Sequence, residues 1–390
     1  MQLTIHQIDA FTHALFKGNY AAVIPLESWL DDDLMLNIGA ENNVSETAFT
    51  CRQTDGRFAI RWFSPLMEID FCGHATLAAA YVLCEEHNVS QIRFIADAVG
   101  ELIVNKNNDG SFAMTFPKQA PVEVKNPPQA LLNGLSIQPV KVLKNRQAYF
   151  AVYESAMQVE SLNTDSQLLK TLAPHDVVAT APSDEYDFVS RYFWPASGGD
   201  EDYVTGSIHT GLAPYWAPLL GKTQLTAYQA SSRGGHIQCE VGESTVTLTG
   251  HAVRYLKDTI WPLIHEQLPK AEMHVYGAYS SQKVEQLHNK KQDFLIKGFA
   301  DDVHKVMQQA KVCLAPLRFG AGLKGKLIDA MQNGLPCVMS EIAAEGMYKN
   351  LSANFVRAND KIATTAAGKS VARIQSMLKA VIFSFFSIDW

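Results

Sequence analysis

Four stretches of the chain carry side chains that could transfer protons to and from carbon. They are Asp9–Asn19, Glu41–Phe49, Ile69–Thr76 and Glu201–Ser207. Carboxylates and imidazoles serve as general acids and bases, and burial can raise the pKa of a carboxyl toward neutrality. Glu46, His74 and Asp202 are therefore the candidate catalytic residues. Taken singly, each has an ordinary structural explanation: a solvated Glu at a helix end, a helix-cap His and a turn carboxylate.

Two glycine positions each stand before an apolar stretch that could form a buried helix. Gly73 precedes one stretch, and Gly206 with Ser207 precedes the other. Backbone N–H groups at a helix start attract anions, which suits a substrate carboxylate. A tight turn needed for packing would also explain both glycines, and the two explanations are compatible.

The bulk composition excludes several classes of function. The net charge of −7 with dispersed Lys and Arg argues against nucleic-acid or anionic-membrane binding. We see no signal peptide and no apolar run of the roughly 18 residues that a membrane span requires, so we expect a cytoplasmic protein. The six cysteines lack metal-binding spacing, which predicts reduced thiols and no metal site.

The elements that must position these residues can be read from the hydrophobic pattern. Residues 58–63 and 91–95 alternate as half-buried strands do. Residues 73–83 contain helix formers with almost no polar face, which predicts a helix surrounded by protein. The Pro-rich segment 118–130 is typical of a linker between two lobes.

The second part of the chain repeats this plan. A strand is expected at 187–193, followed by an acidic pair and the apolar stretch 206–216, in which Pro214 would remove one helical hydrogen bond. Each half thus offers a carboxylate and a buried helix that opens with glycine. The pattern indicates a weak internal duplication, with lobes at 1–118 and 119–257.

Together with Arg191-Tyr192-Phe193-x-Pro195 and Gln229-x-Ser231-x-Arg233-Gly234-Gly235, the four stretches resemble the PhzF (phenazine biosynthesis-like) family over residues 1–257. The resemblance implies an α+β fold like that of diaminopimelate epimerase, with two lobes, each a sheet wrapped round a central helix. It implies an isomerase that needs no cofactor and no metal and acts on a small-molecule carboxylate. We also expect a homodimer.

The same resemblance assigns roles to individual residues. Glu46 would shuttle a proton between two carbons of the substrate, with His74 and Asp202 beside it at the cleft. Substrate binding would involve a further set of residues. They are Ser45, Gly73, Gly206 and Ser207.

The sequence departs from the family pattern at several positions. Tyr20, Tyr203 and Ile208 replace the residues usual there, which puts the fit of the family's substrates in doubt. Related amino-acid epimerases use two facing cysteines as acid and base. Here Cys72 stands at the first position and Thr205 at the second, so a two-thiol racemase is disfavoured and Cys72 is expected to be a small buried residue.

Residues 258–352 follow a different plan of alternating strands and helices, typical of a parallel, Rossmann-like α/β sheet. We expect four strands and two helices there. The strands are 272–277, 293–296, 312–315 and 336–339, and the helices are 302–310 and 326–333. The segment 353–390 stays unassigned, and its apolar run 380–386 would need shelter.

Residues 261–347 resemble the donor-binding half of a GT-B glycosyltransferase. Gly320, Gly322 and Lys326 would belong to a vestigial sugar-nucleotide loop. Gly320, Gly322 and Gly325 also have the G-x-G-x-x-G spacing that suggests a dinucleotide site. The module lacks the acceptor domain of such enzymes, which indicates a gene fusion. The alternative function is therefore sugar-nucleotide binding or transfer, and a further alternative is an inactive fusion.

Overall fold

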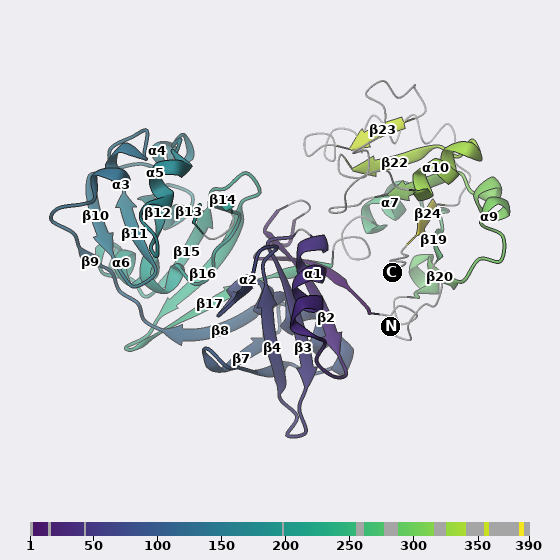
Figure 1. The fold of residues 1–390 in the computed structure, drawn as a ribbon, viewed down its shortest axis with the longest axis horizontal. Helices are drawn as coiled ribbons and strands as arrows, with labels where there is room; N and C mark the ends of the chain where they lie inside the picture. Colours follow the sequence, from purple (N-terminus) through teal and green to yellow (C-terminus); the bar gives the residue numbers. More distant parts are fainter. Residues whose placement is uncertain are drawn as a thin grey trace. The chain divides into compact units, whose positions relative to one another are not determined.

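The computed structural model describes residues 3–14, 17–42, 44–196, 199–254, 261–276, 288–315, 325–340, 355–358 and 382–385. The chain divides into two compact units, residues 3–253 and 254–390 (Figure 1). Each unit is described by itself below. No helix in the described ranges combines the length and apolar character needed to cross a membrane.

The first half of the first unit contains nine strands and two long helices. The strands are β1 His6–Ala10, β2 Asn19–Leu26, β3 Glu46–Arg52, β4 Phe58–Phe63, β5 Glu68–Ile69, β6 Gln91–Ala96, β7 Gly100–Lys106, β8 Phe112–Pro117 and β9 Val122–Glu123. The helices are α1 Asp32–Asn42 and α2 Gly73–His87. The strands expected at 58–63 and 91–95 are confirmed as β4 and β6.

Helix α2 forms the centre of this half. Every residue from Gly73 to Cys84 is buried, and the helix packs against β1, β2, β3, β6, β7 and β8. The expected buried helix is thus confirmed, because a helix without a polar face is stable only when strands surround it. The helix ends at Asn88, whose left-handed backbone (φ 52°) lets its N–H bond the carbonyl of Cys84.

The second half of the unit contains nine further strands and four helices. The strands are β10 Lys141–Lys144, β11 Ala148–Val152, β12 Asp176–Pro182, β13 Phe188–Trp194, β14 Gly199–Asp202, β15 Gln224–Gln229, β16 Gly235–Val241, β17 Thr245–Gly250 and β18 Ala252–Arg254. The helices are α3 Gln129–Asn133, α4 Ala156–Glu160, α5 Ser166–Lys170 and α6 His209–Leu220. Strand β17 pairs with β8, which joins the two halves of the first unit in one mixed sheet.

Helix α6 packs against β15, β16 and β17. It begins at His209, so the prediction that Gly206 and Ser207 open the helix is wrong by two to three residues. The amides of His209 and Thr210 bond the carbonyls of Gly206 and Ser207 at 3.0 and 3.1 Å. This tight three-residue spacing makes a turn that leads into the helix. The helix continues through Pro214.

The second unit contains a six-stranded parallel sheet in the order β20-β19-β24-β21-β22-β23. The strands are β19 Met273–Tyr276, β20 Phe294–Gly298, β21 Val312–Ala315, β22 Cys337–Ser340, β23 Phe355–Ala358 and β24 Ile382–Phe385. The helices are α7 Trp261–Gln267, η2 Lys290–Gln292, α9 Val303–Gln309 and α10 Gly325–Gln332.

The expected elements of the second unit are observed in β19 to β22, α9 and α10. Part of the apolar run that needed shelter is strand β24, which lies between β19 and β21. Gly320 and Gly322 of the expected sugar-nucleotide loop lie outside the described residues, and of Lys326 only the backbone is described, in α10.

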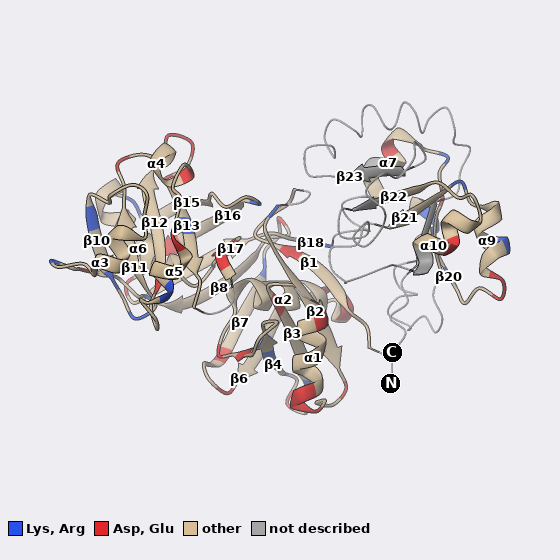
Figure 2. Ribbon diagram, turned by 45° about the horizontal axis from the view of Figure 1, so that its top comes forward, with Lys and Arg blue, Asp and Glu red and all other residues tan. Residues whose placement is uncertain are grey.

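Charged residues are scattered over the described elements. In the view of Figure 2, both the blue (Lys and Arg) and the red (Asp and Glu) segments are spread over many elements. This distribution agrees with the dispersed charge of the sequence, which carries a net charge of −7.

Candidate active site

The three candidate catalytic residues come from ends of different elements of the first unit. Glu46 is the first residue of β3, His74 is the second residue of α2 and Asp202 is the last residue of β14. All three side chains are buried. Strand and helix ends carry backbone groups that regular structure leaves free, which makes them common places for functional side chains.

Glu46 and His74 form a buried pair. Oε2 of Glu46 lies 2.9 Å from Nε2 of His74, and the two residues are 4 and 3 % exposed. Burial lowers the pKa of His74, but the carboxylates of Glu46 and Asp202 outweigh burial, so the pKa of His74 is raised overall. Each charge is thus stabilised by its partner, because an isolated buried charge would be strongly unfavourable.

Asn19, the first residue of β2, connects these groups. Its Nδ2 lies 3.1 Å from Nδ1 of His74 and donates to Oδ1 of Asp202 at 2.7 Å. It also donates to the carbonyl of Val204 at 3.0 Å, and Ser45 Oγ donates to Asn19 Oδ1 at 3.0 Å. An amide nitrogen has two protons for these three acceptors. The amide can therefore follow a change in the protonation of either neighbour.

Asp202 is held on its other side by Thr205, whose hydroxyl donates to Oδ2 at 2.5 Å. Burial raises the pKa of Asp202 to about 6, with the charge of His74 acting in the opposite direction. Gln229 fixes the surrounding backbone by bonding the carbonyl of Asp202 at 2.9 Å and the amide of Thr205 at 2.8 Å. Two carboxyl groups and one imidazole therefore share a small, dry environment.

Cys72 contributes a thiol to this environment. Its Sγ lies 3.4 Å from Nδ1 of His74, and burial raises its pKa well above the usual value. The thiol therefore keeps its proton near neutral pH and supplies little reactive thiolate, as expected for a small buried residue. Glu46, Cys72 and His74 place one ligand atom each within 4.8 Å of one another, so among the described residues this group could hold a metal ion.

The start of α2 lies next to the turn that leads into α6. A Cβ added to Gly73 would stand 3.7 Å from the amide nitrogen of Ser207 and 3.8 Å from Cα of Gly206. A Cβ on Gly206 would in turn stand 3.1 Å from Cζ of Phe11. The turn at Gly206 and Ser207 therefore lies beside the first turn of α2, whose N–H groups have no acceptor within the helix. Such a position suits an anion such as a carboxylate.

Two of the three residues that depart from the family pattern, Tyr20 and Tyr203, pack together. The rings of Tyr20 and Tyr203 lie 5.4 Å apart, and the guanidinium of Arg233 lies 5.0 and 5.6 Å from their centres. Tyr20 and Tyr203 each follow a site residue, Asn19 and Asp202. Arg233 thereby bridges the two chain segments that carry the Asn19–Asp202 hydrogen bond.

Asn19, Thr205 and Gln229 also belong to the site but are not among the residues predicted from the sequence. Asn19 and Thr205 stand inside the stretches that we singled out, but their amide and hydroxyl groups are common in turns. Gln229 lies 27 residues from Asp202 in the chain. A signal for Asn19 and Gln229 would have been a polar residue at the end of an otherwise largely apolar strand.

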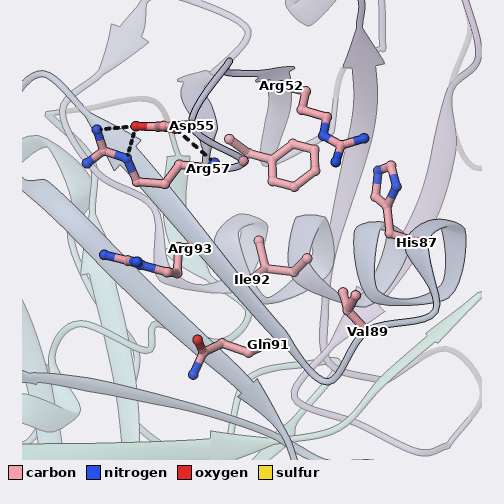
Figure 3. A pocket seen from close by; sticks show the side chains of 10 residues that line it. Arg52, Asp55, Arg57, His87, Val89, Gln91, Ile92 and Arg93 are labelled. Carbon is pink, nitrogen blue, oxygen red and sulfur yellow. Dashed lines mark hydrogen bonds and ion pairs between the residues drawn. The ribbon is translucent and has the colours of Figure 1, made fainter.

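A hollow lies at the far end of β3 from Glu46, beside the last residue of that strand, Arg52. Arg52, Arg57, Arg93 and His87 are among its lining residues (Figure 3). Arg57 is paired with Asp55 at 2.7 Å and Arg93 with Glu101 at 2.7 Å. Because acids neutralise two of its three arginines, this hollow is a weaker candidate for anion binding.

Two family models match the chain. The model described as phenazine biosynthesis-like protein (PhzC-PhzF) matches residues 8–258. The model described as glycosyl transferases group 1 matches residues 243–371.

Individual relatives cover the first unit. An uncharacterized isomerase of Pseudomonas aeruginosa is 45 % identical over 67 % of this chain and 99 % of its own length. A phenazine biosynthesis-like domain-containing protein of Homo sapiens is 34 % identical over the same shares. The crystal structure of a PhzF-family protein from Enterococcus faecalis has 39 % identity and a TM-score of 0.62, covering 65 % of this chain and 97 % of that chain.

Proposed function

Because the chain belongs to the phenazine biosynthesis-like (PhzC-PhzF) family and is an isomerase, we propose that it moves a proton between two carbons of a small carboxylate. Glu46 is the general acid and base of this proposal. The observation that carries it is the buried contact of 2.9 Å between Glu46 and His74.

The proton has a simple path in this mechanism. A carboxylate oxygen of Glu46 takes the proton from one substrate carbon, and the electron pair of that C–H bond is delocalised over the substrate. The Glu46 carboxyl then returns the proton to a second carbon, which shifts a double bond and restores the enzyme. His74 and Asp202 hold polar groups of the substrate, and the dry surroundings strengthen these electrostatic contacts.

We further propose that residues 1–118 and 119–257 are two lobes, each wrapped round its central helix, α2 or α6. This interpretation is supported by the packing of strands on both helices. The substrate carboxylate would lie near Gly73, Gly206 and Ser207, where the start of α2 lies next to the turn that leads into α6. Ser45, which bonds Asn19, would contribute to the same binding site.

The first prediction concerns the reaction itself. In deuterium oxide, the purified protein should introduce deuterium at carbon into at least one member of a panel of small cyclic and amino carboxylic acids. Exchange follows because a proton held by Glu46 can be replaced from solvent between turnovers. Proton NMR of each acid measures the loss of the C–H signal. Absence of exchange throughout a panel that includes dihydro-hydroxyanthranilates would count against the proposal.

The second prediction concerns metals. Pre-incubation with a chelator should leave the exchange rate unchanged, because the proposed proton transfer runs through Glu46 itself. Glu46, Cys72 and His74 could bind a metal. The measurement therefore distinguishes proton transfer by Glu46 from a metal-dependent reaction. Exchange that disappears with the chelator and returns with added Zn²⁺ would assign the three residues to a metal centre instead.

The third prediction concerns the second unit, for which a second function is favoured by the glycosyl transferases group 1 match over residues 243–371. We propose that residues 258–352 are a partial, Rossmann-like donor-binding domain. A chain that ends at residue 257 should fold and exchange deuterium like the full chain. Residues 258–390 alone should not transfer sugar, because transfer needs an opposing wall that encloses the acceptor.

The two shortened chains are compared with the full chain by thermal melting, deuterium exchange and a sugar-nucleotide hydrolysis assay. Unfolding of the chain that ends at residue 257 would contradict the modular interpretation. Sugar transfer by residues 258–390 would favour the alternative function.

A further inference from the structure

A chain of hydrogen bonds leads from Ser207 away from Glu46, through three residues that the proposed mechanism does not use. Gln147 Nε2 lies 2.9 Å from Oγ of Ser207 and 3.0 Å from the hydroxyl of Tyr192. Tyr192 in turn donates to Oδ2 of Asp176 at 2.6 Å. Gln147 immediately precedes β11, Asp176 opens β12 and Tyr192 lies in β13.

The direction of each hydrogen bond in this chain follows from the Asp176 carboxylate at its end. An ionised carboxylate only accepts hydrogen bonds, so the proton of Tyr192 must point at Asp176. The Tyr192 oxygen then has only lone pairs left for Gln147, which requires the amide nitrogen of Gln147 to face it. The second proton of that nitrogen points at Ser207 Oγ. The Ser207 oxygen therefore accepts from Gln147.

The groups are in these states at pH 8. Burial raises the pKa of Asp176 to about 6, against the opposing effect of the Tyr192 hydrogen bond, and this pKa still leaves the carboxyl ionised at pH 8. Burial also raises the pKa of Tyr192 well above its usual value, so that its hydroxyl keeps its proton. The backbone holds the ends of the chain in place, since the amide of Asp176 bonds the carbonyl of Gln147 at 3.1 Å.

We propose that Asp176, Tyr192 and Gln147 form a positioning relay that keeps the Ser207 hydroxyl as a hydrogen-bond donor to the substrate carboxylate. This inference rests on the proposed function, which places that carboxylate at the start of α2 and the turn that leads into α6. Ser207 cannot use its proton toward Gln147, whose nitrogen has no free acceptor. With Gln147 excluded as its acceptor, the Ser207 proton is left for the substrate in this proposal, and it would favour an acceptor such as a carboxylate oxygen over a donor such as an ammonium group.

The test is a double-mutant cycle at pH 8 on Ser207→Ala, Tyr192→Phe and the two combined. The readouts are kcat and KM of deuterium exchange for the panel acid that wild type exchanges fastest, and the Kd of benzoate by NMR titration. Loss of one hydrogen bond to a charged group should raise KM and Kd about tenfold in Ser207→Ala and several-fold in Tyr192→Phe. Adding Tyr192→Phe to Ser207→Ala should change neither KM nor Kd further. The kcat of each variant should stay within about twofold of wild type.

Two further variants separate the relay from general damage to the fold. Tyr153→Phe removes another buried tyrosine hydroxyl, which donates to the carbonyl of Ile137 at 2.9 Å, and should leave KM and Kd unchanged. Gln147→Met interrupts the relay at a half-buried position and should change KM and Kd as much as Tyr192→Phe does. This variant tests the relay if Tyr192→Phe does not fold.

The relay would be overturned if the effects of Tyr192→Phe and Ser207→Ala on KM and Kd were additive, or if neither variant had an effect. Deuterium exchange by wild type would in that case still support the isomerase. Weakened, non-additive benzoate binding in a protein that exchanges no panel acid would support the relay and count against the isomerase. Wild type that neither exchanges an acid nor binds benzoate would overturn both.

Discussion

Replacing Glu46 by Gln should reduce the rate of deuterium exchange by about 10⁴-fold, the upper end of the range of about 10²–10⁴-fold for a single acid–base group. The amide can occupy the same space beside His74, but it cannot take a proton from carbon and return it. The fold should persist, because Gln keeps an oxygen and a nitrogen for the polar contacts of Glu46. The measurements are kcat by proton NMR and melting temperature by circular dichroism.

The matched control for this variant is Glu41→Gln. Glu41 lies five residues earlier, in α1, and its side chain is exposed, so the same chemical change should leave kcat and melting temperature as in wild type. Near-full exchange by Glu46→Gln would show that another group moves the proton. A large fall in melting temperature would show instead that Glu46 acts mainly through the buried pair with His74.

Replacing Asp202 by Asn should reduce kcat/KM about 10²-fold at pH 8, the lower end of the range for acid–base residues. The amide still accepts from Asn19 but carries no charge to balance His74 or to hold a cationic or hydroxyl group of the substrate. Because burial raises the pKa of Asp202 to about 6, wild type should lose kcat/KM as the pH falls through about 6 and Asp202 gains a proton. This acidic limb should shift or vanish in Asp202→Asn.

The stability contributed by Asp202 depends on pH in the opposite direction to its contribution to kcat/KM. A carboxyl whose pKa is raised by folding binds its proton more tightly in the folded state, so its contribution to stability falls as the pH rises from about 4 to 6. An amide has no such dependence. The melting temperature of Asp202→Asn relative to wild type should therefore rise over this range. The control is Asp200→Asn, at an exposed neighbouring position. It should change neither kcat/KM nor the pH dependence of the melting temperature.

The sequence alone determined the local elements and the chemistry of the candidate residues. Helix α2 could be predicted because Gly73 to Leu83 has no polar face, which is a property of neighbouring residues only. The strands at 58–63 and 91–95 followed from alternation in the same way. Family motifs then pointed to Glu46, His74 and Asp202, and the family match over residues 8–258 confirms the family.

The tertiary structure decided which partner each of these residues has. Asn19 and Asp202 bond each other across 183 residues of chain, and Gln147 reaches Ser207 across 60. Such pairs leave no periodic signal in the sequence, because they depend on how β2, β14 and the start of α6 meet after the sheet has formed. The raised pKa of Asp202 likewise comes from burial among distant residues. A side chain's type is local, but its solvent exposure and hydrogen-bond partners are set by packing.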